Sequence, residues 1–171
     1  MKTVTITGAA LSVDELLAVV DGAHLALGPE ARTRIEASHA VIEAVLADRE
    51  PVYGLTTQVG HGKDELLTEE QLGRQQRMLV LTHSGGMGAP LKTRIVRAAL
   101  AARVNGIARG GSGASVAAAD VLVAMVNAGV HPLVPETASV GAGDIGQMAG
   151  MSAGRHRDRP RRAPGRDARR R

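Results

Sequence analysis

The core of this chain has to be built almost without aromatic side chains. Its 171 residues include one Tyr, Tyr53, and no Trp or Phe. Leu, Val, Ile, Ala and Met must therefore supply the buried surface, and a chain of this length is sufficient for one domain with its own core. Aliphatic residues recur at helical spacing in several segments, so we predict a mainly α fold of packed helices.

Capping signals and prolines divide the chain into elements. Ser12 and Glu15 form one capping box, and Thr68 and Gln71 form another. Residues 3–6 alternate between polar and apolar, which predicts a short N-terminal strand. Prolines at helix starts and glycines at helix ends supply the other boundaries. We expect helices over about 13–21, 29–49, 69–83, 90–108 and 117–127, with Gly85 and Gly86 ending the third. In the fourth helix, Ile95, Val96, Leu100, Val104 and Ile107 should face the core, and Lys92, Arg94, Arg97 and Arg103 should form a solvated face.

The positive net charge of the chain comes from its C-terminal end. The formal charge is +4, but residues 155–171 hold nine Arg and two Asp, so residues 1–154 are mildly acidic. The tail uses only six residue types, which is the alphabet of GC-rich DNA read out of frame. We therefore interpret residues 1–154 as the folded region and 155–171 as a disordered or out-of-frame tail. A nucleic-acid-binding arm is a less favoured alternative.

Several classes of protein and site are not favoured. No run of about 18 apolar residues is present, and the first six residues lack the apolar stretch of a signal peptide. The chain has no Cys, which excludes thiolate metal sites and suits the cytoplasm. Its six His show no ligand spacing such as His-Glu-x-x-His. We expect a cytoplasmic protein without a membrane partner or a metal ion.

Four stretches together carry a resemblance to a known family. They are residues 52–60 (VYGLTTQVG), 81–88 (LTHSGGMG), 109–113 (RGGSG) and 135–144 (PETASVGAGD). In this order they resemble the aromatic amino acid ammonia-lyases, and the histidine ammonia-lyases most of all, over about residues 2–151. The resemblance implies the N-terminal part of the helical ammonia-lyase fold, truncated before the family's central helical bundle is complete. It also implies a small amino acid substrate and a homo-oligomer.

The resemblance assigns roles to two side chains. It implies nonoxidative elimination of ammonia from L-histidine to give urocanate, with Tyr53 as the base that takes the β-proton. His83 would contact the substrate ring. Tyrosine ammonia-lyases also have His at this position, so tyrosine remains an alternative substrate. The residues by themselves allow structural roles too: a half-buried Tyr53 with a hydrogen-bonded hydroxyl, and a His83 that complements a helix dipole.

The loop that carries Tyr53 departs from the family pattern. That pattern reads Tyr-Gly-x-Asn-Thr-Gly-Phe-Gly, and here Thr56 stands for the Asn and Gln58 for the second Gly. Gln58 has a Cβ, so a left-handed backbone at this position would be costly. The sequence therefore leaves the shape of the loop open.

The segment that forms the family's prosthetic group is degenerate. In the family, Ala-Ser-Gly before an Asp cyclises to a methylidene-imidazolone, but here Ala142 is followed directly by Gly143 and Asp144. The methylidene carbon needs a side chain with a β-carbon that carries a leaving hydroxyl; Ala142 has no hydroxyl and Gly143 has no β-carbon. We expect that the group does not form and that the chain is inactive as written. The alternative function is a non-catalytic helical partner of a full-length homologue.

Overall fold

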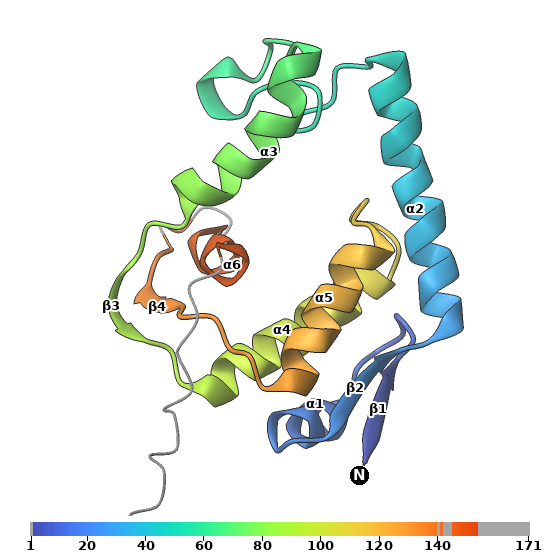
Figure 1. Cartoon of the computed structure of the whole chain (residues 1–171), viewed down its shortest axis with the longest axis vertical. Helices are drawn as coiled ribbons and strands as arrows, with labels where there is room; N and C mark the ends of the chain where they lie inside the picture. The colour runs from blue at the N-terminus through green and yellow to red at the C-terminus, as the bar shows by residue number, and fades with distance from the viewer. Residues whose placement is uncertain (1, 140, 142–144, 154–171) are drawn as a thin grey trace, which may run out of the picture.

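The computed structural model describes residues 2–139, 141 and 145–153, and helices dominate it (Figure 1). The helices are α1 (Val13–Val20), α2 (Pro29–Asp48), α3 (Glu69–His83), α4 (Thr93–Ala108), α5 (Val116–Ala128) and α6 (Ile145–Ser152), with a 3-10 turn, η1, at Gly60–Gly62. The strands are β1 (Thr3–Ile6), β2 (His24–Leu27), β3 (Met87–Pro90) and β4 (Pro135–Thr137). The prediction of a mainly α fold with a short N-terminal strand is confirmed.

The N-terminal residues form a small β-α-β unit. β1 and β2 pair in parallel, and α1 connects them. The capping box forms as predicted: the Glu15 N–H donates to the Ser12 hydroxyl at 3.2 Å, and the Ser12 N–H donates to the Glu15 carboxylate at 2.8 Å. The Asn127 side chain, in α5, accepts from the N–H of Leu25 and donates to its carbonyl, both at 2.8 Å. This side chain satisfies backbone groups of β2 that would otherwise be left without partners in a partly buried position.

α4 is the central helix of the core, packing against both α1 and α5. Its buried residues are Val96, Leu100, Ala101, Val104, Ile107 and Ala108. The surrounding core is likewise aliphatic, apart from Met151 of α6. Each fully buried Val, Leu or Ile contributes roughly 1.5–3 kcal/mol relative to its exposed state. The core therefore forms without aromatic residues, through close packing of small and medium-sized side chains around α4.

α2 and α3 form two long sides of an open frame (Figure 1). The loop between them, residues 49–68, lies at the end of the molecule away from the N-terminus, while α4 and α5 lie across the base and α6 packs beside α3. α2 buries only Ala31 and Ile35, and α3 buries none of its 15 residues. A helix of this length is marginal in water by itself. α3 is therefore the least anchored long helix among the described residues.

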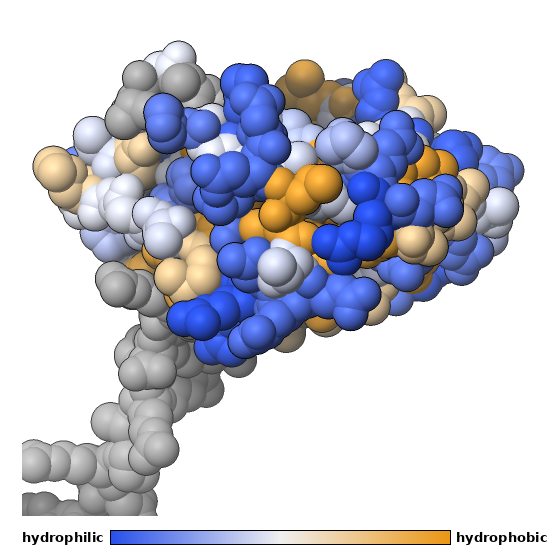
Figure 2. Space-filling model, turned by 90° about the horizontal axis from the view of Figure 1, so that it is seen from above, coloured by the Kyte–Doolittle hydropathy of each residue, from blue (hydrophilic) through white to orange (hydrophobic). Residues whose placement is uncertain are grey.

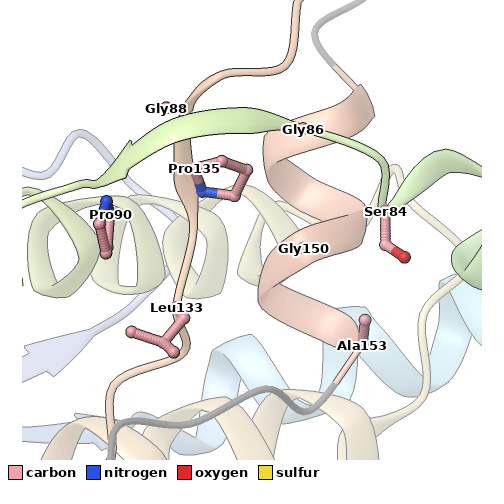
Figure 3. Close-up of a pocket in the computed structure, with 8 residues that line it drawn as sticks. All are labelled: Ser84, Gly86, Gly88, Pro90, Leu133, Pro135, Gly150 and Ala153. Carbon is pink, nitrogen blue, oxygen red and sulfur yellow. The ribbon is translucent and has the colours of Figure 1, made fainter.

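β3 and β4 form an antiparallel ribbon against α6 (Figure 3). Two glycines allow the close approach: a Cβ on Gly86 would lie 2.3 Å from Pro135 Cγ, and one on Gly146 would lie 2.4 Å from the Ala138 carbonyl oxygen. A cavity of about 220 Å³ remains between ribbon and helix, and no charged side chain lines it. The ribbon holds the chain in place as it approaches residue 139.

Two details of the predicted fourth helix are wrong. Pro90 ends β3 and does not open the helix, because the Leu91 N–H donates to the Val134 carbonyl at 2.8 Å and continues the pairing with the β4 segment. α4 begins at Thr93 instead. Ile95 is 48% exposed, since it lies about 100° around the helix from the buried stripe that starts at Val96. β2, β3 and β4 were not predicted, because their residues (HLAL, MGAP and PET) do not alternate between polar and apolar as those of β1 do.

Candidate active site

The loop between α2 and α3 is held by the buried residue Thr56. Its hydroxyl accepts a hydrogen bond from the Val52 N–H at 2.8 Å and donates to the Glu50 carbonyl. The Leu67 N–H donates to the Thr56 carbonyl at 2.8 Å, which ties the start of the loop to its end. Thr56, which replaces the Asn of the family pattern, therefore supplies both a donor and an acceptor to the loop backbone.

Gln58 does not adopt the left-handed backbone that was in question. Among the described residues Arg49 is the only non-glycine with a positive φ, while Gly54 and Gly60 have φ of +71° and +63°. The Gln58 N–H donates to the Glu65 carbonyl at 3.0 Å, and its side chain donates to the Glu65 carboxylate at 2.8 Å. The loop closes on itself through these bonds, and its glycines take the sharp turns.

Tyr53 lies on the surface of this loop, with 64% of the residue exposed. Its hydroxyl oxygen accepts a hydrogen bond from the Gly60 N–H at 3.2 Å. A backbone donor at a phenol oxygen is the kind of group that stabilises developing negative charge there. The sequence did not predict this donor, because only the turn of the loop brings Gly60 back to Tyr53.

His83 is the last residue of α3 and is half-buried. Its Nδ1 lies 2.8 Å from the Leu79 carbonyl oxygen. Because a carbonyl only accepts hydrogen bonds, Nδ1 carries the proton in the neutral ring and Nε2 is then an acceptor. No described residue forms a hydrogen bond with Nε2. His83 is thus both a helix-end residue, as the sequence indicated, and a side chain with one nitrogen available to a ligand.

Tyr53 and His83 line the same cavity, which has a volume of about 860 Å³. The cavity lies between the Tyr53 loop and helices α3 to α6, and most of its wall is aliphatic. Arg103 of α4 is the one permanently charged residue among its described lining residues. The sequence placed Arg103 on a solvated face. Arg103 follows Leu100 by three residues and precedes Ile107 by four, and both of these residues line the same cavity. This helical spacing is the signal in the sequence that could have identified Arg103 as a lining residue.

The degenerate motif lies only partly within the described residues. Ala142, Gly143 and Asp144 are outside them. Before the motif, the Gly141 N–H donates to the Ser139 hydroxyl at 3.0 Å, and after it Ile145 opens α6 and lines the large cavity. The helix that follows Asp144, α6, therefore forms part of the wall of the cavity that Tyr53 and His83 also line.

The described residues contain neither a metal-binding group nor a membrane-spanning helix. Over 2–139, 141 and 145–153, no three or more His, Cys, Asp or Glu side chains form a group that could hold a metal ion. None of the helices in these ranges has the length and apolar character needed to cross a membrane.

Solved structures share this arrangement of elements. The ergothioneine-degrading enzyme ergothionase from Treponema denticola matches with a TM-score of 0.84 and 27% identity, over 87% of this chain and 30% of that one. Histidine ammonia-lyase from Trypanosoma cruzi matches with a TM-score of 0.79 and 33% identity, over 89% of this chain and 29% of that one. The fold is therefore that of the N-terminal portion of the ammonia-lyases.

Sequence comparison identifies the family directly. The model of the aromatic amino acid lyase family matches residues 11–160, and the chain belongs to this family. A histidine ammonia-lyase from Treponema denticola is 38% identical over 151 residues, which are 87% of this chain and 30% of that protein. The chain thus spans about 30% of the length of the relatives that it matches.

Proposed function

We propose that this chain forms part of a histidine ammonia-lyase site, in which His83 contacts the ring of L-histidine and Tyr53 takes its β-proton. The observation that carries this proposal is that the two residues, on a loop and at a helix end, line one cavity of about 860 Å³. The histidine ammonia-lyases among the chain's relatives support the choice of substrate.

The described side chains suit these roles. The Gly60 N–H orients the Tyr53 hydroxyl, and Nε2 of neutral His83 can accept a hydrogen bond from the N–H of an imidazole. The phenol O–H of tyrosine could donate to the same nitrogen, so tyrosine remains the alternative amino acid substrate.

The family's methylidene-imidazolone does not fit the residues of this chain. Ala142 lacks the hydroxyl and Gly143 lacks the β-carbon from which the methylidene carbon would be made. We propose that the group does not form here, and that the chain as written releases no ammonia from L-histidine. No step of the reaction is assigned to it.

The chain as written is tested by absorbance and mass spectrometry. Purified chain incubated with L-histidine should give no growing ultraviolet absorbance from urocanate, and the peptide that contains residues 139–153 should have its unmodified mass. Growing absorbance, or a peptide lighter by two waters (one from ring closure and one from side-chain dehydration), would show that the group forms and would contradict this part of the proposal.

A chimera tests the roles of the two side chains. Residues 1–153, with Ser inserted between Ala142 and Gly143, are joined to the remaining part of the Treponema denticola histidine ammonia-lyase. We expect urocanate from this protein, and Tyr53→Phe should lower kcat by about 10²–10⁴-fold, the usual loss for a general base. His83→Leu should lower kcat/KM at least about tenfold, because a polar contact to the ring is lost.

The matched control is His61→Leu, since His61 is exposed on the same loop and does not line the cavity. It should change kcat/KM by less than about twofold, as is usual for surface substitutions. An active chimera that tolerates Tyr53→Phe, or one in which both histidine substitutions have equal effects, would contradict the assigned roles.

The missing serine favours a second candidate substrate class. The Treponema denticola ergothionase, which has a similar fold, degrades ergothioneine, a histidine betaine with a trimethylammonium group. A quaternary ammonium leaves as a neutral amine without prior activation. Tyr53 would take the β-proton, the C–H electron pair would form the C=C bond, and the C–N pair would leave with trimethylamine. The chimera without the inserted Ser should then release trimethylamine from ergothioneine and no ammonia from L-histidine; the absence of trimethylamine would reject this candidate.

We also propose that the protein acts in the cytoplasm as part of a homo-oligomer. The absence of Cys favours a reducing compartment, and the resemblance implies sites that draw on several subunits.

A further inference from the structure

We propose that Gln76 of α3 is a positioning residue, which holds the loop that carries Tyr53 against the helix that carries His83. The side-chain amide of Gln76 donates a hydrogen bond to the Gly54 carbonyl at 2.9 Å. Gly54 directly follows Tyr53, so this bond restrains the peptide next to the phenol. The effect on catalysis rests on the proposed role of Tyr53 as the base, whereas the restraint on the loop does not.

The other hydrogen bonds of this half of the loop stay within it. The Gly60 N–H, for example, donates to the Tyr53 hydroxyl at 3.2 Å, and both residues belong to the loop. Among the described residues, the bond from Gln76 is the one hydrogen bond that joins residues 52–60 to a residue outside 49–68. The internal bonds therefore set the shape of the loop, and the bond from Gln76 sets its place against α3.

α3 connects the two proposed site residues through this bond. Gln76 lies seven residues before His83. This separation is about two helical turns, or about 10.5 Å along the axis, and it places both side chains on nearly the same face. Leu79 and Val80, which lie between them, line the large cavity together with His83, but Gln76 is not among its described lining residues. Gln76 therefore acts on the site through Gly54 and α3, and not by contact with a ligand in the cavity.

Water competes with the bond between Gln76 and Gly54. The bond is exposed to solvent, and Gln76 is an exposed residue. At this end of the molecule hydrophilic residues predominate on the surface, with apolar residues between them (Figure 2). Loss of one such hydrogen bond changes an opening equilibrium by about 2–10-fold. Gln76 therefore shifts the population of loop positions and does not lock the loop in one of them.

Gln75 gives a matched control. It is the neighbour of Gln76 on α3, but its side chain forms no hydrogen bond with a described residue. An ionised Glu keeps the shape of Gln and a similar helix propensity, but its carboxylate accepts hydrogen bonds and cannot donate them. Gln76→Glu therefore removes the donor to Gly54, while Gln75→Glu makes the same change of charge one position away and leaves the donor in place.

Tyr53 reports its own mobility in the full chain, because it is the one aromatic residue of the sequence. All of the intrinsic fluorescence of the protein therefore comes from this side chain. Gln76→Glu should lower the fluorescence anisotropy of Tyr53, since released loops move on the nanosecond timescale. It should also speed hydrogen exchange of the amides over residues 52–60 by about 2–10-fold. Gln75→Glu should change neither quantity.

A second variant removes the donor without adding charge. Gln76→Met has a side chain of similar length and should give the same changes in anisotropy and exchange as Gln76→Glu. Far-UV circular dichroism checks the helix content of all the variants, and Gln76→Met serves if Gln76→Glu does not fold.

The chimera with the inserted Ser measures the catalytic consequence. Gln76→Glu should lower kcat by about 2–10-fold and change KM for L-histidine by less than about twofold, because the loop holds the base and not the substrate ring. Gln75→Glu should leave both constants within about twofold, as is usual for substitutions that remove no contact. This division between kcat and KM separates positioning of Tyr53 from binding of the substrate.

Three results would overturn the proposal. One is unchanged anisotropy and exchange of the full chain with both Gln76 variants. Another is an equal change with Gln75→Glu. The third is a loss in the chimera that falls on KM and leaves kcat unchanged, which would make Gln76 a binding residue. A chimera that makes no urocanate, or that tolerates Tyr53→Phe, would instead reject the proposed function, and the fluorescence of the full chain would still decide the role of Gln76.

Discussion

Arg97 connects three segments of the chain at a single side chain. Its guanidinium donates to the Val19 carbonyl at 2.7 Å, near the end of α1, and to the Val126 carbonyl at 2.8 Å, near the end of α5. It also lies 3.4 Å from His131 Nε2. The helical pattern of charges placed Arg97 on a solvated face of α4, which is wrong because the two helix ends that it caps are far away in the sequence.

We predict that Arg97→Met lowers the free energy of unfolding by about 2–4 kcal/mol, because it removes charge-assisted hydrogen bonds to the ends of two helices. Urea unfolding followed by circular dichroism measures this. The control is Arg94→Met: Arg94 pairs with Asp21 at 3.1 Å, but both side chains are mostly exposed. Exposed pairs contribute no more than about 1 kcal/mol. Equal effects of the two substitutions would show that Arg97 is not a structural link.

At the site, residue types and positions were predicted from the sequence, but contacts were not. The family motifs singled out Tyr53 and His83, and the structure brings both to one cavity. The donor to the Tyr53 hydroxyl, Gly60, depends on the turn of the loop. The roles of Tyr53, His83, Ala142, Gly143 and Asp144 stay predictions.

At the level of elements, the β3–β4 ribbon depends on glycine for its contact with the rest of the protein. Gly85 and Gly86 are adjacent, and the sequence assigned both the same role of ending α3. The structure separates them: a Cβ on Gly86 would lie 2.3 Å from Pro135 Cγ, while a Cβ on Gly85 would meet nothing within 4 Å. Only Gly86 is needed for close packing.

We predict that Gly86→Ala lowers the free energy of unfolding by about 1–3 kcal/mol, the usual cost of overpacking. Gly85→Ala should be neutral or stabilising by up to about 1 kcal/mol, since it restricts the unfolded chain without a clash. Thermal unfolding of the two variants in parallel tests this, and a larger loss for Gly85→Ala would contradict the packing described for the ribbon.

For the whole molecule, the open frame predicts an uneven distribution of stability. α4 buries six residues, while α3 buries none. We predict that backbone amides of α3 exchange with deuterium at least about tenfold faster than those of α4 in the free chain, because regions with few buried contacts open at a lower free energy. Hydrogen-exchange mass spectrometry gives both rates in one experiment. Equal protection of the two helices would contradict the loose attachment of α3.

Local signals in the sequence were sufficient for the helices that Ser12 and Thr68 cap, for the family motifs and for the lack of a dehydratable serine after Ala142. Each of these depends on residues within a few positions of one another, or on atoms that a residue type does or does not have. Tertiary structure alone decided that Ile95 faces solvent, that Arg97 caps α1 and α5, and that Tyr53 and His83 share a cavity. Burial and pairing of this kind depend on segments far apart in the chain, which no local pattern encodes.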